Sequence, residues 1–140
     1  MELPSLGDFY KKYKNEPEKS RTESFELGQR VSHELMTKLN LRGDDLDTLA
    51  TVVNAFMGEV KCETTAIVEG NKAVYHNRSF CPVMISARLF NQLWLWLDKN
   101  FAWPFMEGLA SVVNPNVKHQ VPMVRAKGDL VCRHEWEISK

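Results

Sequence analysis

Three cysteines and two histidines are the residues of this sequence best suited to chemistry. Cys62, Cys81 and Cys132 lie in three separate segments, and His119 and His134 lie near the end of the chain. Thiolates and imidazoles are preferred ligands of zinc, and both side chains also serve enzymes as nucleophiles, acids or bases. What these residues can do therefore depends on whether the fold brings them together.

A metal site is the first hypothesis for these residues. Its ligands would be Cys62, Cys81, Cys132 and His134, around zinc or another divalent transition metal ion. The fourth ligand could instead be His119, Glu63 or a water, and an open fourth position could activate water for attack on a cyclic amidine or amide carbon. The sequence has no pair of cysteines two residues apart, the usual spacing in zinc sites. The alternative is that the cysteines pack as small buried apolar side chains.

Cys81 is also a candidate nucleophile. It stands directly before Pro82, and proline favours the first turn of a helix. The positive end of the helix dipole would lower the pKa of the Cys81 thiol and favour the thiolate. His134 or His76 could then accept a proton, and His119 is a further candidate acid or base. The competing interpretation is a cysteine that simply packs under the helix.

Helical periodicity predicts the elements that position these side chains. Residues 1–21 are expected to form a short helix and a loop, and apolar residues then recur at helical steps over 25–39 and 46–57. A pair of helices is predicted over 82–98 and 104–113, with the interruption at Asn100 and Pro104.

The pattern changes to strand-like alternation after the third helix. Gly70–Asn71 is a typical two-residue turn, and a hairpin around it would pair Glu69 with Lys72. Continuing this register places Cys62 opposite Ser79, near Cys81 at the open end of the hairpin.

A second hairpin is predicted from Val117 to Met123 and back from Leu130 to Ile138, with Lys127–Gly128 as the turn. Its two apolar faces coincide only in one register. The pairs in this register are His119 with Trp136, Val121 with His134, and Met123 with Cys132. Both histidines and Cys132 would then face the core.

This order of elements predicts an α+β fold, in which two antiparallel hairpins form a sheet packed against the helical pair, beside the N-terminal helices. The 140 residues fit a single domain over 1–140. We expect a small-molecule pocket between the C-terminal sheet and the helices of residues 82–113.

Aromatic residues are dense in this region. Trp94 and Trp96 cannot face the same way on one helix, so one of them would suit a ligand wall or a homodimer contact. The residues expected to contact a ligand are Trp94, Trp103, Phe105, Met123 and Trp136.

Composition excludes several classes of function. The 18 basic and 18 acidic residues balance, so no strong field draws the protein to nucleic acid or to a membrane surface. No apolar run approaches the length of a membrane span, and the first residues lack the pattern of a signal peptide. An odd number of cysteines fits a reducing compartment, so we expect a cytoplasmic protein.

Short motifs in residues 60–138 carry a family resemblance. They are Phe80-Cys81-Pro82, the aromatic run from Trp103 to Gly108, Val113-Asn114-Pro115, and the segment from Lys127 to Cys132. This region resembles the L-2-amino-thiazoline-4-carboxylic acid hydrolase-like family and, more distantly, the vinyl-4-reductase domain.

The resemblance implies a small-molecule pocket and two functions. One is metal-assisted or cysteine-assisted hydrolysis of a small cyclic C–N or C–S compound. The other is a non-catalytic sensor or carrier of an apolar or aromatic ligand, with any zinc structural. Some vinyl-4-reductase regulators hold zinc with cysteines and a glutamate, and only Cys132, after Gly128–Asp129, matches such a ligand by its local motif.

Overall fold

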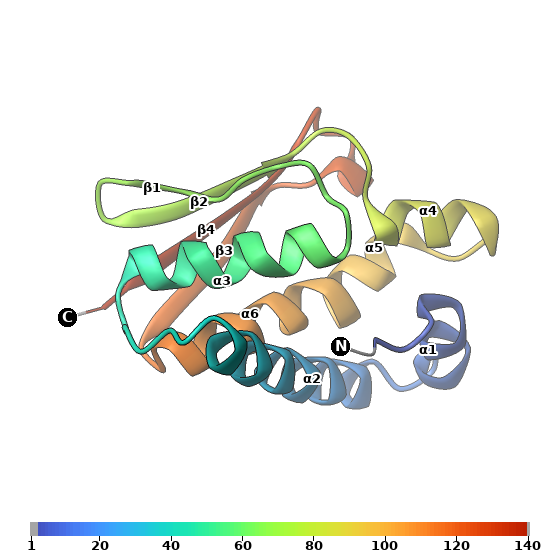
Figure 1. Cartoon of the computed structure of the whole chain (residues 1–140). Coiled ribbons are helices and arrows are strands. Elements are labelled where there is room, and N and C mark those ends of the chain that lie inside the picture. The colour runs from blue at the N-terminus through green and yellow to red at the C-terminus, as the bar shows by residue number, and fades with distance from the viewer. Residues whose placement is uncertain (1–2, 140) are drawn as a thin grey trace.

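The computed structural model describes residues 3–139, and it has the α+β architecture predicted from the sequence. A four-stranded antiparallel sheet carries the helices on one side (Figure 1). The elements are α1 (Leu6–Tyr13), α2 (Pro17–Lys38), α3 (Leu46–Glu59), β1 (Ile67–Glu69), β2 (Lys72–Asn77), α4 (Pro82–Leu89), α5 (Trp94–Leu97), the π-helical turn η1 (Asp98–Ala102), α6 (Trp103–Val113), β3 (Val117–Met123), the 3₁₀ turn η2 (Arg125–Lys127) and β4 (Cys132–Ile138). Among these described helices, none is both long and apolar enough to span a bilayer.

The two predicted hairpins form one sheet in the order β1-β2-β4-β3. The first has the predicted pairing of Glu69 with Lys72, but its ladder ends at Ile67. The chain leaves the sheet at Ala66, whose backbone N–H and carbonyl bond to the side-chain amide of Asn54 at 2.6 and 3.0 Å. The extended register predicted that Cys62 pairs with Ser79, and this prediction is wrong.

The second hairpin has the predicted pairing of His119 with Trp136, and a β-bulge then shifts its register. Met123 lies opposite Arg133 instead of Cys132. The shift lies between Gln120 and Met123, a stretch that contains Pro122, which has no N–H to donate to the neighbouring strand. The predicted start of the last strand at Leu130 is also wrong, because Leu130 is 89% exposed in the loop and β4 begins at Cys132.

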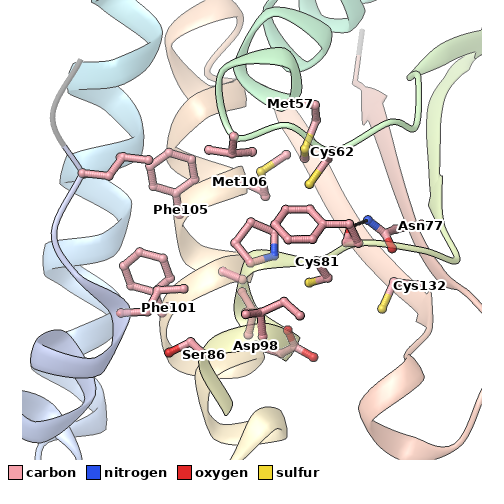
Figure 2. Close-up of a pocket in the computed structure, with 18 of the residues that line it drawn as sticks. Met57, Cys62, Asn77, Cys81, Ser86, Asp98, Phe101, Phe105, Met106 and Cys132 are labelled. Carbon is pink, nitrogen blue, oxygen red and sulfur yellow. Dashed lines mark hydrogen bonds between the residues drawn. The ribbon is translucent and has the colours of Figure 1, made fainter. Parts of the chain in front are cut away.

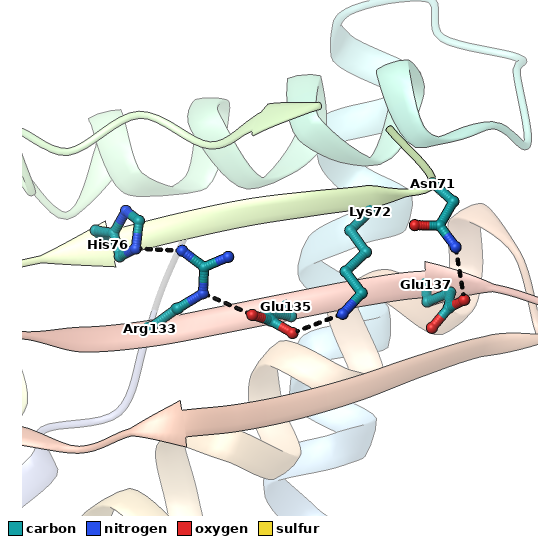
Figure 3. Close-up of polar contacts among 6 residues, drawn as sticks. All are labelled: Asn71, Lys72, His76, Arg133, Glu135 and Glu137. Atoms are coloured by element: carbon teal, nitrogen blue, oxygen red, sulfur yellow. Dashed lines mark hydrogen bonds and ion pairs between the residues drawn. The ribbon is translucent and has the colours of Figure 1, made fainter. Parts of the chain in front are cut away.

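The outer face of the sheet carries linked polar side chains instead of a second layer (Figure 3). Glu135 accepts from Lys72 at 3.1 Å and from Arg133 at 2.6 Å. Arg133 also lies 2.6 Å from the Nε2 atom of His76. Because His76 is engaged on this face, it does not serve as a base for Cys81.

The predicted break in the helical pair lies at a different place. Helix α4 ends at Leu89, and Asn91 takes a left-handed conformation with φ of 52°. The Gln92 N–H then bonds to the Ala87 carbonyl, which closes the helix end. From Trp94 to Val113 the chain remains helical through α5, η1 and α6, so the predicted interruption at Pro104 is wrong.

Pro104 is accommodated inside this helix because other donors replace its missing N–H. The carbonyl of Asn100, four residues earlier, instead accepts hydrogen bonds from the hydroxyls of Ser20 and Ser24 on α2, at 2.5 and 3.3 Å. The loop expected before residue 22 is also wrong around Pro17. Pro17 begins α2, where proline occupies the first turn of the helix.

Helices α2 and α6 cross at two glycines. A Cβ atom at Gly108 would overlap the backbone carbonyl of Phe25, and a Cβ atom at Gly28 would overlap that of Phe105. The two backbones therefore approach more closely than any other residue type would allow. This contact joins the N-terminal half of the chain to the helix that forms one wall of the site.

We expect Gly108→Ala to lower the free energy of unfolding by about 3 kcal/mol, because the helices must separate to admit a methyl group. Gly58→Ala is the matched control, since Gly58 lies in α3 with open space around it. That change should raise stability by about 0.5–1 kcal/mol through helix propensity alone. Urea unfolding of both variants measures this, and a similar effect of the two changes would contradict the close crossing.

Candidate functional site

A cavity of about 460 Å³ lies between the helices and the inner face of the sheet, where the sequence predicted a pocket (Figure 2). Its walls come from the segment before α1, the end of α3, α4, the η1–α6 helix, β2 and the start of β4. Most of the lining is apolar. The lining side chains that carry polar or sulfur atoms able to do chemistry are Cys62, Tyr75, Asn77, Cys81, Ser86, Asp98, Cys132 and His134.

The cavity brings all three cysteines to one space, as the zinc and nucleophile hypotheses require. Cys62 follows α3, where Lys61 has a φ of 61° and the Cys62 N–H bonds to the Met57 carbonyl at 2.9 Å. Cys81 is the N-cap of α4, directly before Pro82 as predicted. Cys132 begins β4. Figure 2 shows the three sulfur atoms on the same side of the pocket.

Burial keeps these thiols protonated at neutral pH. It raises the pKa of Cys62 and that of Cys132 to about 11. Burial also raises the pKa of Cys81. The backbone N–H groups of Met84 and Val83, at the start of α4, lower this pKa, but their effect is smaller than that of burial. The predicted depression of the Cys81 pKa is therefore wrong, because the loss of water outweighs the helix terminus.

The two histidines predicted as acid and base are in direct contact. The Nε2 atom of His119 lies 2.8 Å from Nδ1 of His134, and their rings stack with centroids 5.1 Å apart. His119 Nδ1 lies 3.4 Å from a carboxylate oxygen of Glu107 on α6. Of the two histidines, His134 lines the cavity and His119 does not. His134, His119 and Glu107 therefore form a hydrogen-bonded chain that leads from the cavity to an exposed carboxylate.

When both rings are neutral, this hydrogen-bonded chain determines which nitrogen of each ring carries the proton. A His119 that donates from Nδ1 to Glu107 must accept at Nε2, so His134 donates from Nδ1 and keeps a lone pair on its own Nε2. Burial, and secondarily the neighbouring His119, lowers the pKa of His134 well below its usual value. His134 is therefore a neutral ring near neutral pH, and the same burial weakens it as a proton acceptor.

Asp98 is a site residue that the sequence analysis missed. It is the first residue of η1, it lines the cavity and it is only 5% exposed. Its Oδ2 atom is buried without a hydrogen-bond partner among the described residues. Burial raises the pKa of Asp98 to about 7. The signal available in the sequence is a lone carboxylate directly after the apolar run Trp94–Leu97, a context that disfavours its charge.

The predicted ligand contacts divide into two groups. Trp103 and Phe105 line the cavity. The other three lie outside its lining, so a ligand in this cavity would not contact them directly. Trp94 lies under the Arg125 guanidinium, Trp136 is buried against His119, and Met123 is exposed on β3.

Among residues 3–139, no three His, Cys, Asp or Glu side chains lie close enough together to hold a metal ion. The predicted ligands share one cavity without forming a coordination shell; they are Cys62, Cys81, Cys132 and His134. Zinc remains a prediction that elemental analysis of the purified protein tests.

Comparison with known proteins yields no family: no family model matches the chain, and neither does any curated protein. The resemblance of residues 60–138 to the hydrolase-like family stays a prediction, and the site is interpreted from its own residues.

The unpaired carboxyl of Asp98 predicts a specific pH dependence of stability. Its pKa is about 7 in the folded protein and near 3.8 when solvated, so the folded state binds the proton more tightly. The stability contributed by the neutral carboxyl is present below about pH 4 and is lost as the pH rises through 7. Asp98→Asn cannot ionise, so its gain in stability over the wild type should grow across this range, to an upper limit of about 4 kcal/mol.

Urea unfolding at several pH values between about 5 and 8.5 measures this difference. Asp44→Asn removes an equal charge from an exposed loop position and serves as the control. A difference between Asp98→Asn and the wild type that does not change with pH would contradict the buried, unpaired state of Asp98.

Proposed function

We propose that this protein binds a small, largely apolar molecule in the cavity between its sheet and its helices. The observation that carries the proposal is the cavity itself, about 460 Å³ with a mostly apolar lining. This volume falls in the range of sites for small ligands, which combine apolar walls with a few polar groups.

The mouth of the cavity supports an apolar ligand. Leu89 and Phe90 line the cavity and are also 72% and 56% exposed, and Phe80, a lining residue before α4, is exposed as well. Apolar surface therefore continues from the interior to the solvent at the end of α4. An apolar molecule could enter along this surface without crossing a charged rim.

One wall of the cavity is braced in advance of binding. The buried amide of Asn77 donates to the Tyr75 hydroxyl at 3.1 Å and to the Phe80 carbonyl at 3.0 Å. Its oxygen accepts from the Ser79 N–H at 3.2 Å and from Arg125 at 3.1 Å. This network fixes the segment between β2 and α4, so binding need not order it, which favours affinity.

The state of the thiols favours binding over cysteine catalysis. A protonated, buried thiol is a small polarizable side chain, whereas a nucleophile must be a thiolate. Since burial raises the pKa of Cys62, Cys81 and Cys132, they serve here as soft lining.

A neutral fluorescent probe, N-phenyl-1-naphthylamine, tests the binding function. We expect saturable binding to one site, weakened roughly tenfold or more by Ile85→Trp, because Ile85 lines the cavity and the larger ring fills it. Leu41→Trp is the control, since Leu41 packs at the edge of the core away from the cavity. Cys81→Ser should keep the affinity within about twofold, since a neutral thiol contributes little polar binding. Equal binding by Ile85→Trp and the wild type would exclude this cavity as the site.

A second candidate is hydrolysis of a small cyclic C–N or C–S compound, as the family resemblance implies. The hydrogen-bonded chain of Glu107, His119 and His134 favours hydrolysis, because this chain places a neutral base at the cavity wall. A water oxygen would attack a ring carbon while His134 Nε2 takes the water proton. In a cyclic amidine, that proton passes to the ring nitrogen, and the ring C–N bond then breaks as the new hydroxyl becomes a carbonyl and its proton also goes to the nitrogen.

This candidate predicts ring opening of L-2-amino-thiazoline-4-carboxylate by the wild type, followed by mass spectrometry. His134→Gln should lower the rate by about 100-fold or more while the fold and the binding of the naphthyl probe persist. His33→Gln, an exposed histidine on α2, should leave the rate unchanged. If the wild type opens no ring, the hydrolytic candidate fails and the binding function stands.

A further inference from the structure

Asp98 places a carboxyl group in the cavity that no described side chain satisfies. Its Oδ2 atom is buried and lacks a hydrogen-bond partner within residues 3–139. Figure 2 shows the carboxyl group close to Cys81 in this view, among the lining side chains. An unpaired buried carboxylate is costly, and such groups concentrate where a ligand completes the site.

Arg125, whose charge acts on the neighbouring Cys81 and Cys132, is engaged elsewhere. The Nη1 atom of Arg125 donates to Asn77 and to the Ser79 carbonyl, at 3.1 and 2.7 Å. Its guanidinium carbon lies 5.7 Å from the centre of the Trp94 ring. Arg125 therefore braces the loop before α4, and within residues 3–139 Asp98 has no ion-pair partner.

The backbone around Asp98 is held in place by the π-helical turn. The Asp98 carbonyl accepts the N–H of Trp103, five residues later. The next part of the turn is fixed by the bonds from Ser20 and Ser24 to the Asn100 carbonyl. Single π-helical turns within α-helices are frequent at functional sites, and this one presents the carboxyl on a rigid support.

We propose that Asp98 selects ligands that carry a protonated basic nitrogen on an apolar body, with the nitrogen donating to its carboxylate. This inference rests on the proposed binding function and names the ligand class. A metal ion is disfavoured because no third suitable side chain among those described lies close enough to join Asp98 in a coordination shell. An anion would be repelled, and a plain hydrocarbon would leave the carboxyl unsatisfied.

The other titratable groups around the cavity do not compete for this role. Cys81 before α4 and Cys132 on β4 act on one another and on Asp98 only as negative charges if ionised, and burial opposes their ionisation. Burial also keeps His134 neutral, and it raises the pKa of Tyr75 far above neutrality. Asp98 is therefore the group that gives this cavity a charge near neutral pH.

Two naphthalene derivatives of nearly equal size test the inference. They are 1-naphthylmethylamine, which is protonated, and 1-naphthylmethanol, which is neutral. Isothermal titration calorimetry at about pH 8 should show the wild type binding the amine roughly tenfold or more tightly than the alcohol. In Asp98→Asn this preference should disappear while the affinity for the alcohol stays within about twofold. Asp44→Asn, which removes an exposed carboxylate, should keep the preference.

The preference of the wild type should also shrink at about pH 5.5, where the Asp98 carboxyl is protonated. Circular dichroism melts confirm that Asp98→Asn is folded. Equal affinity for amine and alcohol in the wild type, or an amine preference that survives in Asp98→Asn, overturns this inference and leaves the apolar binding function standing. Binding of neither compound defeats the proposed function, and this inference with it.

Discussion

The carbonyl of Asn100 is the point on which the helical layer depends. Pro104 cannot donate to it, so it would be an unsatisfied buried acceptor if Ser20 and Ser24 did not donate from α2. These bonds join residues about 80 positions apart in the chain. They seat α2 on the continuous helix from Trp94 to Val113, and the crossing at Gly28 and Gly108 then brings the two backbones into contact. Polar satisfaction and close packing thus support the same arrangement.

The same proline shapes the site. With its N–H absent, the helix widens into a π-helical turn in which Trp103 bonds to the Asp98 carbonyl, five residues back. The widened turn places Asp98 at the cavity instead of in solvent. A regular helix would be more stable there, and an aspartate facing water would carry no penalty. The free-energy cost of burying the Asp98 carboxyl is offset by the serine bonds and by the packing of α2 nearby.

The sequence predicts those parts of the fold that depend on local patterns. Gly70–Asn71 and alternating apolar residues were sufficient to place both hairpins and the pairing of His119 with Trp136. The three cysteines do line one cavity, but the registers that placed Cys62 opposite Ser79 and Cys132 opposite Met123 are wrong. The bulge between Gln120 and Met123 was missed because alternation continues through it. The continuous helix through Pro104 was missed because its stability comes from hydroxyls about 80 residues away, which no local window contains.

The site was also predicted only in part, because the burial of a side chain depends on the whole fold. Residue type singles out Cys81, Cys132 and His134 as reactive, and topology brings them together, but burial decides which of them ionise. Asp98 was missed because an aspartate near the end of a helical stretch ordinarily faces water. Only the layered packing of α4, η1 and the sheet shows that it does not.

Burial acts on every titratable side chain in the cavity in the same direction, toward the neutral form. It raises the pKa of the thiols, lowers the pKa of His134, and raises the pKa of Asp98 only to about 7. Below neutrality the described lining is therefore uncharged, and above it the cavity carries one negative charge. A cavity of this kind tolerates apolar molecules throughout and gains a charge-assisted hydrogen bond only with a cation. Its affinity for a basic ligand must accordingly rise with pH until the ligand itself loses its proton.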